Sequence, residues 1–291
     1  MSRSVIVLGA GGMAGQAFCK YFNELGFDVL GVSRVGSDIN LDLINQYDAL
    51  DYLFQSFAPT FVVNCAALVS LKACEDNPIL CYQINSLLPQ KLSNSSVRHG
   101  FKFIHISTDH YYVLNNIPVL HSETDPIFLF NTYAKSKYLG ELYSASCDKS
   151  LIIRTNITGF RNQPQRPTFI EWMIDSFQNP EPIKLFTDFY TSTIHVSAFC
   201  RYVYSLVEHG CSGLFNISSS ESISKYQFAS LLAKEMRVTQ ATFVQASVEG
   251  LYPKRCSDLG LDCTKAESIL DVAMPSSQDV VRSLAKEYQY L

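Results

Sequence analysis

The sequence lacks any Lys- or Arg-rich run, and its formal net charge is −4. Nucleic-acid binding depends on basic side chains that neutralise phosphates, so we expect no nucleic-acid partner. No apolar stretch approaches the roughly 20 residues that a membrane-spanning helix needs. The N-terminus also shows no apolar segment followed by a small-residue cleavage site. These absences predict a cytoplasmic protein that does not enter a membrane.

Paired metal-ligand spacings are also missing. The nine cysteines form no C-x-x-C pair, and the six histidines are scattered. Zinc sites need clustered ligands, and the disulfide frameworks of secreted proteins usually have an even number of cysteines. We therefore expect free thiols in a reducing compartment and no catalytic metal.

Short apolar runs alternate with amphipathic helical patterns through the first half of the chain, as in repeated βαβ units. The expected strands are residues 5–8, 29–32, 61–63, 103–106 and 151–153, and a later strand is expected at 213–217. Helical patterns lie at residues 14–25, 45–56, 78–97, 131–147 and 224–236. After about residue 155 prolines interrupt this alternation of strand and helix patterns. The fold class is α/β, a Rossmann-type doubly wound parallel sheet with a smaller, irregular α/β substrate-binding domain.

The expected domain boundaries follow this change of pattern. An NAD(P)-binding domain would comprise residues 1–155, with a returning contribution around residues 193–217. The substrate-binding domain would comprise residues 156–192 and 218–291.

A glycine-rich turn follows the first expected strand. Gly9, Gly12 and Gly15 have the spacing G-x-x-G-x-x-G and lead into a helical pattern. A helix N-terminus offers backbone N–H groups and a partial positive charge to a pyrophosphate. The strand before the turn and the helix after it favour dinucleotide binding over an ordinary turn.

Arg34 follows Ser33 at the end of the second expected strand. Sites selective for NAD usually have an acidic residue here, whereas arginine suits the 2′-phosphate of NADP. NADPH is therefore the expected cofactor. NADH stays open, because Asp38 lies nearby and Arg34 also fits a solvated surface position.

Tyr133 and Lys137 are four residues apart, on one face of an expected helix. A nearby ammonium stabilises the tyrosinate and makes the phenol a usable acid near neutrality. Such a pair is common by chance, but Thr108 directly follows the 103–106 strand, where ligands bind in open α/β sheets. The three residues predict a dehydrogenase site.

At this point the chain resembles the extended short-chain dehydrogenase/reductase family, in particular its dTDP-4-dehydrorhamnose reductase branch of nucleotide-sugar 4-ketoreductases. The motifs that carry the resemblance include the glycine turn, Ser107-Thr108-Asp109, Tyr133-x-x-x-Lys137 with Gly140-Glu141, and Arg154-Thr155-Asn156. Others are Asp42-Leu43, Asn64-Cys65-Ala66-Ala67, Glu75, Asn85, residues 123–126 and residues 258–265. The chain departs from the branch's usual residues at Val69, Lys72, His110 and Thr191, so the resemblance does not fix the sugar.

The resemblance implies a role for each matching residue. Tyr133 would protonate the alkoxide formed by hydride transfer, Lys137 would bind the nicotinamide ribose, and Thr108 would hold the carbonyl oxygen. The substrate would contact Thr108, Asp109 and Asn156. The cofactor would contact Gly9, Gly12, Met13, Ala14, Ser33, Arg34, Asp42, Leu43, Cys65, Ala66, Ala67, Tyr133 and Lys137.

The expected activity is reduction of the 4-keto group of a nucleotide-linked 6-deoxy sugar, for deoxysugar and surface polysaccharide biosynthesis. One alternative is a nucleotide-sugar epimerase that keeps NAD bound, and another is a regulatory subunit similar to the methionine adenosyltransferase β subunit. Lys254 and Arg255 could meet a substrate diphosphate or be solvated surface charges. The expected partner is the nucleotide sugar, and a homodimer is one oligomeric state that the sequence allows.

Overall fold

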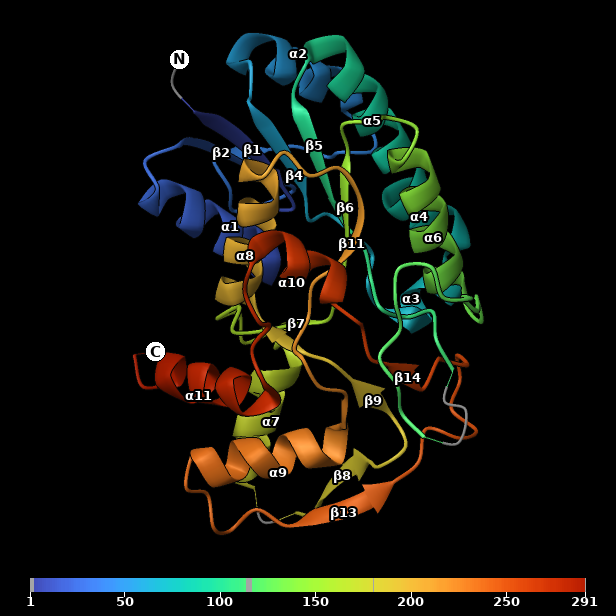
Figure 1. Ribbon diagram of the computed structural model, residues 1–291, viewed down its shortest axis with the longest axis vertical. Helices are drawn as coiled ribbons and strands as arrows, with labels where there is room; N and C mark the ends of the chain where they lie inside the picture. Colours follow the sequence, from blue (N-terminus) through green and yellow to red (C-terminus); the bar gives the residue numbers. More distant parts are fainter. Residues whose placement is uncertain (1–2, 114–116, 180, 291) are drawn as a thin grey trace. The chain divides into compact units, whose positions relative to one another are not determined.

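The computed structural model describes residues 3–113, 117–179 and 181–290, and the chain forms two compact units (Figure 1). The first unit consists of Met1–Thr108, Leu129–Arg154 and Cys200–Phe215. The second unit consists of Asp109–Phe128, Thr155–Phe199 and Asn216–Leu291. Along the sequence, the chain changes from one unit to the other more often than the expected boundaries imply, because residues 109–128 belong to the second unit.

A seven-stranded sheet forms the centre of the first unit, with the strand order β11-β6-β5-β4-β1-β2-β3. The pairs β1–β2, β1–β4, β2–β3, β4–β5 and β5–β6 are parallel. This arrangement confirms the Rossmann-type doubly wound sheet. The strands are β1 (Ser4–Leu8), β2 (Asp28–Ser33), β3 (Ile39–Asn40), β4 (Phe61–Asn64), β5 (Lys102–Ile106), β6 (Leu151–Arg154) and β11 (Gly213–Asn216).

Helices cover both faces of this sheet (Figure 1). Helix α1 lies beside α8, where the rings of Phe22 and Tyr204 are 5.5 Å apart, and α2, α5 and α6 lie over the other face. The helical elements with residues in this unit are α1 (Met13–Glu24), α2 (Tyr47–Phe57), α3 (Leu71–Asp76), α4 (Pro78–Tyr82), a π-helical turn (Gln83–Leu87), α5 (Leu88–His99), α6 (Thr132–Ser144) and α8 (Val196–Glu208). The expected helix at 78–97 is thus α4, the π-helical turn and α5 in succession.

Alternate residues of β1 explain why its sequence is apolar throughout. Ile6 and Leu8 pack in one core cluster with Leu50 and Phe54 of α2. Successive side chains of a strand point to opposite faces, so Val7, which is also fully buried, points to the other face. A strand covered on both faces needs a continuous apolar run rather than an alternating pattern.

The second unit is built from short strands and four helices within the described residues. Its core contains the apolar faces of α7, α9 and α11, packed with the buried residues Ile183 and Leu185 of β8. The strands are β7 (Ile157–Thr158), β8 (Ile183–Phe186), β9 (Tyr190–Thr191), β10 (Ile194–His195), β12 (Ile223–Ser224), β13 (Phe243–Ala246) and β14 (Asp258–Leu259). The helices are α7 (Phe169–Phe177), α9 (Lys225–Glu235), α10 (Thr264–Leu270) and α11 (Ser277–Tyr288).

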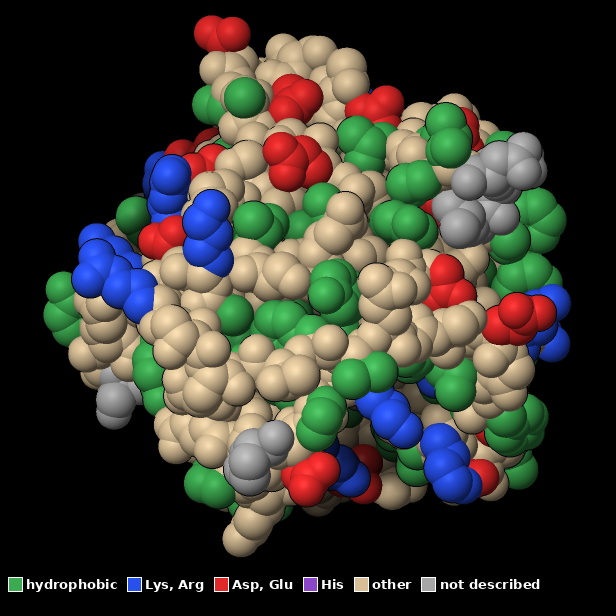
Figure 2. All heavy atoms as spheres, turned by 90° about the horizontal axis from the view of Figure 1, so that it is seen from below, with side chains coloured by type: hydrophobic (Ala, Val, Ile, Leu, Met, Phe, Trp, Pro, Cys, Tyr) green, Lys and Arg blue, Asp and Glu red, His purple; other side chains and the backbone are tan. Residues whose placement is uncertain are grey.

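Charged side chains are mixed on the face shown in Figure 2. Lys and Arg occur there in small groups with Asp and Glu among them, without a continuous surface of one charge. No helix in the described part of the chain is long and apolar enough to cross a membrane.

A buried ion pair joins α6 to the end of β6 in the first unit. The Arg154 guanidinium donates from Nε to Glu141 Oε1 (3.0 Å) and from Nη2 to Oε2 (2.8 Å), and Ser107 Oγ donates to Oε1 (2.5 Å). Both charged side chains are about 5% exposed or less. Their desolvation is offset only while both charges are present.

Arg154→Met is therefore expected to lower the free energy of unfolding by about 3–5 kcal/mol, because the buried Glu141 carboxylate loses the guanidinium that donates hydrogen bonds to both of its oxygens. Chemical denaturation would measure the loss. Arg282→Met is the control, since Arg282 makes an exposed ion pair with Asp279 and should change the value by less than about 1 kcal/mol. Equal losses in the two variants would contradict this account of the pair.

Candidate functional site

The glycine turn packs against the end of β4. Gly9 has φ +78°, and a Cβ on Gly9 would lie 2.8 Å from the backbone nitrogen of Ala66. A Cβ on Gly15 would lie 2.2 Å from the Gly9 carbonyl oxygen. The turn therefore requires glycine at both positions, and the structure brings Gly9 together with Cys65 and Ala66, as expected for one dinucleotide site.

Helix α1 begins at Met13, and no side chain caps its N-terminus at Gly12. The first N–H groups of a helix carry a partial positive charge that favours an anion. A phosphate-binding turn needs this open backbone, so the local geometry suits the predicted pyrophosphate contact at Gly12, Met13 and Ala14.

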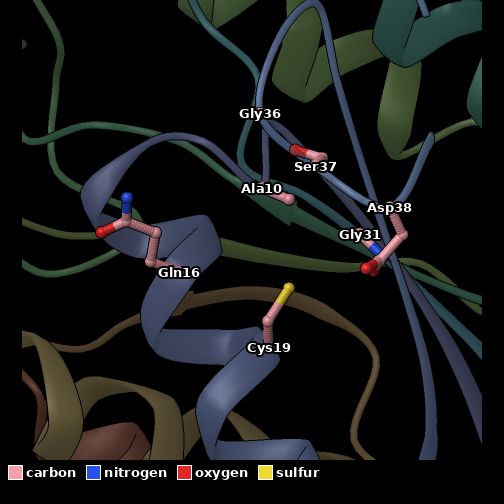
Figure 3. Close-up of a pocket in the computed structure, with 7 residues that line it drawn as sticks. All are labelled: Ala10, Gln16, Cys19, Gly31, Gly36, Ser37 and Asp38. Carbon is pink, nitrogen blue, oxygen red and sulfur yellow. The ribbon is translucent and has the colours of Figure 1, made fainter. Parts of the chain in front are cut away.

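Arg34 and Asp38 have different environments at the end of β2. Both residues are exposed, but Asp38 Oδ2 accepts a hydrogen bond of 2.7 Å from the Gly31 N–H. Figure 3 shows the Asp38 side chain turned toward Gly31, beside a hollow of about 360 Å³ that Gln16 and Cys19 of α1 also line. Asp38 is thus held against the backbone of β2, while Arg34 extends into solvent.

Asp42 and Leu43 lie next to the end of β2, because the Leu41 N–H donates to the Ser33 carbonyl oxygen over 2.8 Å. The Asp42 carboxylate accepts from the Ile44 N–H at 2.9 Å. This backbone hydrogen bond is the main reason that the pKa of Asp42 lies below its ordinary value, with smaller contributions from Asn45 and Arg34. Asp42 and Leu43, two of the predicted cofactor contacts, therefore lie at the same edge of the sheet as Ser33 and Arg34.

Tyr133 and Lys137 lie one turn apart on α6, and both are buried, at 8% and 1% exposed. Lys137 Nζ donates to the Ile106 carbonyl oxygen at the end of β5 over 2.7 Å. Burial lowers the pKa of Lys137 to about 8, although the nearby Glu141 carboxylate favours the ammonium. This hydrogen bond connects the Tyr133–Lys137 pair to the strand end that Ser107 and Thr108 follow.

Asn85 of the π-helical turn supports this face of α6. Its Nδ2 donates to Ser136 Oγ at 3.0 Å and to the Leu68 carbonyl oxygen at 3.0 Å, while its Oδ1 accepts from the Leu68 N–H at 2.9 Å. Ser136 lies between Tyr133 and Lys137 in the sequence. Asn85 belongs to one of the motifs of the family resemblance, but no role was predicted for it. π-helical turns often occur at functional sites.

Glu141 and His105 also contribute to this region, although no role was predicted for them from the sequence. Glu141 follows Lys137 by four residues, so the spacing of residues 133, 137 and 141 was the available signal. His105 is fully buried, and burial, reinforced by the Lys137 charge, holds its pKa well below the ordinary value. Neutral His105 Nδ1 therefore accepts a 3.3 Å hydrogen bond from Asn64 Nδ2, and Asn64 Oδ1 in turn accepts from the Ala66 N–H.

The chain passes from the first unit to the second between Thr108 and Asp109. Asp109 is 1% exposed, and Asn156 Nδ2 donates to its Oδ2 over 2.6 Å. Burial raises the pKa of Asp109, against the opposing effects of His110, Asn156 and Lys225. The structure therefore brings two predicted substrate-binding residues, Asp109 and Asn156, into direct contact.

No cluster of three or more His, Cys, Asp or Glu side chains suited to a metal ion occurs among residues 3–113, 117–179 and 181–290.

The family model described as "RmlD substrate binding domain" matches residues 3–290, and the chain belongs to this family. It is 29% identical to the spore coat polysaccharide biosynthesis protein SpsK of Bacillus subtilis (strain 168), over 79% of this chain and 78% of that one. It is 24% identical to the methionine adenosyltransferase 2 subunit beta of Rattus norvegicus, over 92% and 83% of the two chains. A crystal structure of dTDP-4-dehydrorhamnose reductase from Bacillus anthracis str. Ames in complex with NADP matches with a TM-score of 0.88 at 22% identity, covering 98% and 99%.

The lowered pKa of Lys137 predicts a pH-dependent contribution to stability. The pKa is about 8 in the folded chain, against the ordinary value of 10.5, so folding disfavours the ammonium. This penalty is fully present below pH 8 and disappears as the pH rises toward the unfolded value. The free energy of unfolding of the wild type, minus that of Lys137→Met, should therefore rise by roughly 2 kcal/mol between pH 7.5 and pH 10.

Urea denaturation of both proteins at several pH values would measure this difference. Lys135→Met removes an exposed lysine of the same helix and controls for the loss of one charge. A difference between the wild type and Lys137→Met that stays constant or falls across this pH range would contradict the prediction.

Proposed function

We propose that this member of the RmlD substrate-binding domain family reduces the 4-keto group of a nucleotide-linked 6-deoxy sugar with NADPH. The observation that carries the proposal is the buried Tyr133–Lys137 pair, whose lysine binds the end of β5 just before Ser107 and Thr108. The family match over residues 3–290 supports this class of reaction. The name of the related Bacillus subtilis protein supports a role in polysaccharide biosynthesis.

In this mechanism the protein places the ketone and supplies a proton. The cofactor, when bound, supplies the hydride that reaches the carbonyl carbon. The Thr108 hydroxyl donates to the carbonyl oxygen, and the Tyr133 phenol transfers its proton to that oxygen as it becomes an alkoxide. The Lys137 ammonium stabilises the resulting tyrosinate and binds the nicotinamide ribose.

The residues of the first unit fit a dinucleotide. The glycine turn leaves no room for side chains at Gly9 and Gly15, and α1 has no side-chain cap that would compete with a phosphate. Arg34 suits a 2′-phosphate. We therefore favour NADPH over NADH, in agreement with the NADP bound to the Bacillus anthracis reductase. The first unit would then bind the cofactor, and the second unit would bind the sugar nucleotide.

A second candidate function is that of a regulatory binding subunit. The similarity to the rat methionine adenosyltransferase 2 subunit beta favours it, because a fold can be kept without its chemistry. The intact set of Thr108, Tyr133 and Lys137 supports the enzyme instead.

The test is a panel of dTDP-, UDP-, GDP- and CDP-linked 4-keto-6-deoxy sugars, with NADPH absorbance followed and the product identified. Stoichiometric loss of NADPH with formation of the 4-hydroxy sugar is the expected result. Isomerisation without net loss of cofactor would favour an epimerase. No turnover of any member, together with tight binding to another protein, would favour the regulatory subunit.

Tyr133→Phe should lower kcat by roughly 1,000-fold while the affinity for NADPH stays within about twofold, because the variant removes only the proton donor. Steady-state kinetics and NADPH fluorescence titration would measure the two quantities. Tyr52→Phe is the matched control, since Tyr52 is 68% exposed on α2. Activity in Tyr133→Phe close to that of the control would refute the proposed acid.

Arg34→Met should weaken NADPH binding by roughly 10- to 100-fold, the effect of losing charge-assisted hydrogen bonds to the 2′-phosphate. The affinity for NADH should be unchanged, and it serves as the internal control because NADH lacks that phosphate. Equal losses for NADPH and NADH would show that Arg34 does not bind the 2′-phosphate.

A further inference from the structure

Lys225 occupies a position that is unfavourable for a cation. It is the first residue of α9, and Ser224 and Gln227 cap this helix through a reciprocal capping box. The positive end of a helix dipole repels an ammonium and attracts an anion. A lysine in this position therefore needs local support for its charge.

Two aromatic rings and one hydroxyl hold the Lys225 ammonium in place. Its Nζ lies 5.0 Å from the ring centre of Phe169 and 5.9 Å from that of Phe189, and it donates to Thr191 Oγ1 over 3.1 Å. This is the one hydrogen bond of Lys225 Nζ within the described residues. Because an ammonium has three N–H groups, two are left for a ligand.

Four hydrogen bonds of defined direction connect this ammonium to Asp109. The Asp109 carboxylate can only accept a hydrogen bond, so Asn156 donates to it from Nδ2. Asn156 Oδ1 in turn accepts a hydrogen bond of 3.0 Å from Thr193 Oγ1. Because the Thr193 hydroxyl uses its hydrogen in the bond to Asn156, Thr191 Oγ1 must be the donor in its 3.0 Å hydrogen bond with Thr193 Oγ1. The Thr191 oxygen then accepts from Lys225. A carboxylate at one end and a cation at the other orient every bond of this chain.

Two cationic side chains, Lys225 and Arg255, act on His110, the residue that follows Asp109. His110 is influenced by Asp109, Arg255 and Lys225 together, and burial is the largest effect that lowers its pKa. Arg255 has a buried Nε with no hydrogen-bond partner and forms no salt bridge within the described part of the chain. Lys225 thus acts on both Asp109 and His110, whereas Arg255 acts on His110, which tends to be neutral.

We propose that Lys225 binds the diphosphate of the sugar nucleotide, with its ammonium oriented by the hydrogen-bond chain that ends at Asp109. This inference rests on the proposed function, in which the keto sugar itself is uncharged and the diphosphate is the anion of the substrate. The two remaining N–H groups of Lys225 suit such a group, as does the Arg255 guanidinium, whose Nε has no hydrogen-bond partner within the described residues. Every residue of this argument lies in the second unit.

The proposal has a defined pH dependence. Burial lowers the pKa of Lys225 to about 8, while Asp109 opposes this shift. The ammonium is therefore present below pH 8 and is lost above it. The diphosphate stays ionised through this range, so affinity for it should be high at pH 7 and fall above pH 8.

The experiment is calorimetric titration of the full chain with dTDP at pH 7.0, 8.0 and 9.0, without cofactor. Lys225→Met should bind dTDP at pH 7.0 roughly 10- to 100-fold more weakly than the wild type, and its affinity should be nearly independent of pH. Lys225→Arg, which keeps the charge, should restore at least part of the affinity and remove the fall above pH 8. Lys234→Met removes an exposed lysine of the same helix and should match the wild type.

Each outcome decides the proposal. Equal dTDP affinity in Lys225→Met and the wild type would overturn it while leaving reduction of keto sugars intact. Weakened binding in Lys225→Met, without turnover of any keto sugar by the wild type, would support a nucleoside diphosphate site and refute the reductase. A wild type that binds dTDP with the same affinity at all three pH values would also overturn the role of Lys225, even if the methionine variant did not fold.

Discussion

The hydrogen bond from Lys137 to the carbonyl oxygen of Ile106 is the constraint on which the site of the first unit depends. It joins the middle of α6 to the end of β5, two elements that the sequence separates by some thirty residues. A buried ammonium is costly without partners, so its nitrogen is held where a carbonyl can accept from it. The position of Tyr133, one turn earlier on the same helix, follows from that of Lys137.

The surrounding residues serve to keep this bond in place. Glu141, one turn further along α6, supports the Lys137 charge and is itself held by Arg154 and Ser107. On another side, Asn85 binds Ser136 from the π-helical turn. These contacts together offset the free energy cost of burying the Lys137 ammonium. They also hold the ends of β5 and β6, which Ser107, Thr108 and Asn156 follow in the sequence. Stability and the proposed chemistry therefore depend on the same contacts.

The features of the fold and the site that could be predicted from the sequence are those determined by residues close together in the chain. The glycine turn, the Tyr133–Lys137 spacing and the buried strands were predictable, because backbone conformation and side-chain period act over a few residues. Three features could not be predicted, because they depend on packing between different segments of the chain. They are the hydrogen bond between Asp38 and Gly31, the π-helical turn, and the place of residues 109–128 in the second unit. No role could be predicted for Lys225, because its environment is formed by Thr191, Phe169 and Asp109, which are far from it in the sequence.

Lys137 and Lys225 show how one physical effect can serve two tasks. Burial lowers the pKa of each to about 8, so each ammonium is held close to its point of deprotonation at neutral pH. Lys137 donates a hydrogen bond to the backbone carbonyl of Ile106 and lies one helical turn from Tyr133, the proposed proton donor. Lys225 contacts a hydroxyl and two aromatic rings, which leaves N–H groups for an external anion. We therefore infer from the difference in partners, rather than in pKa, that the first lysine supports the proposed proton donor Tyr133 and that the second binds an anion.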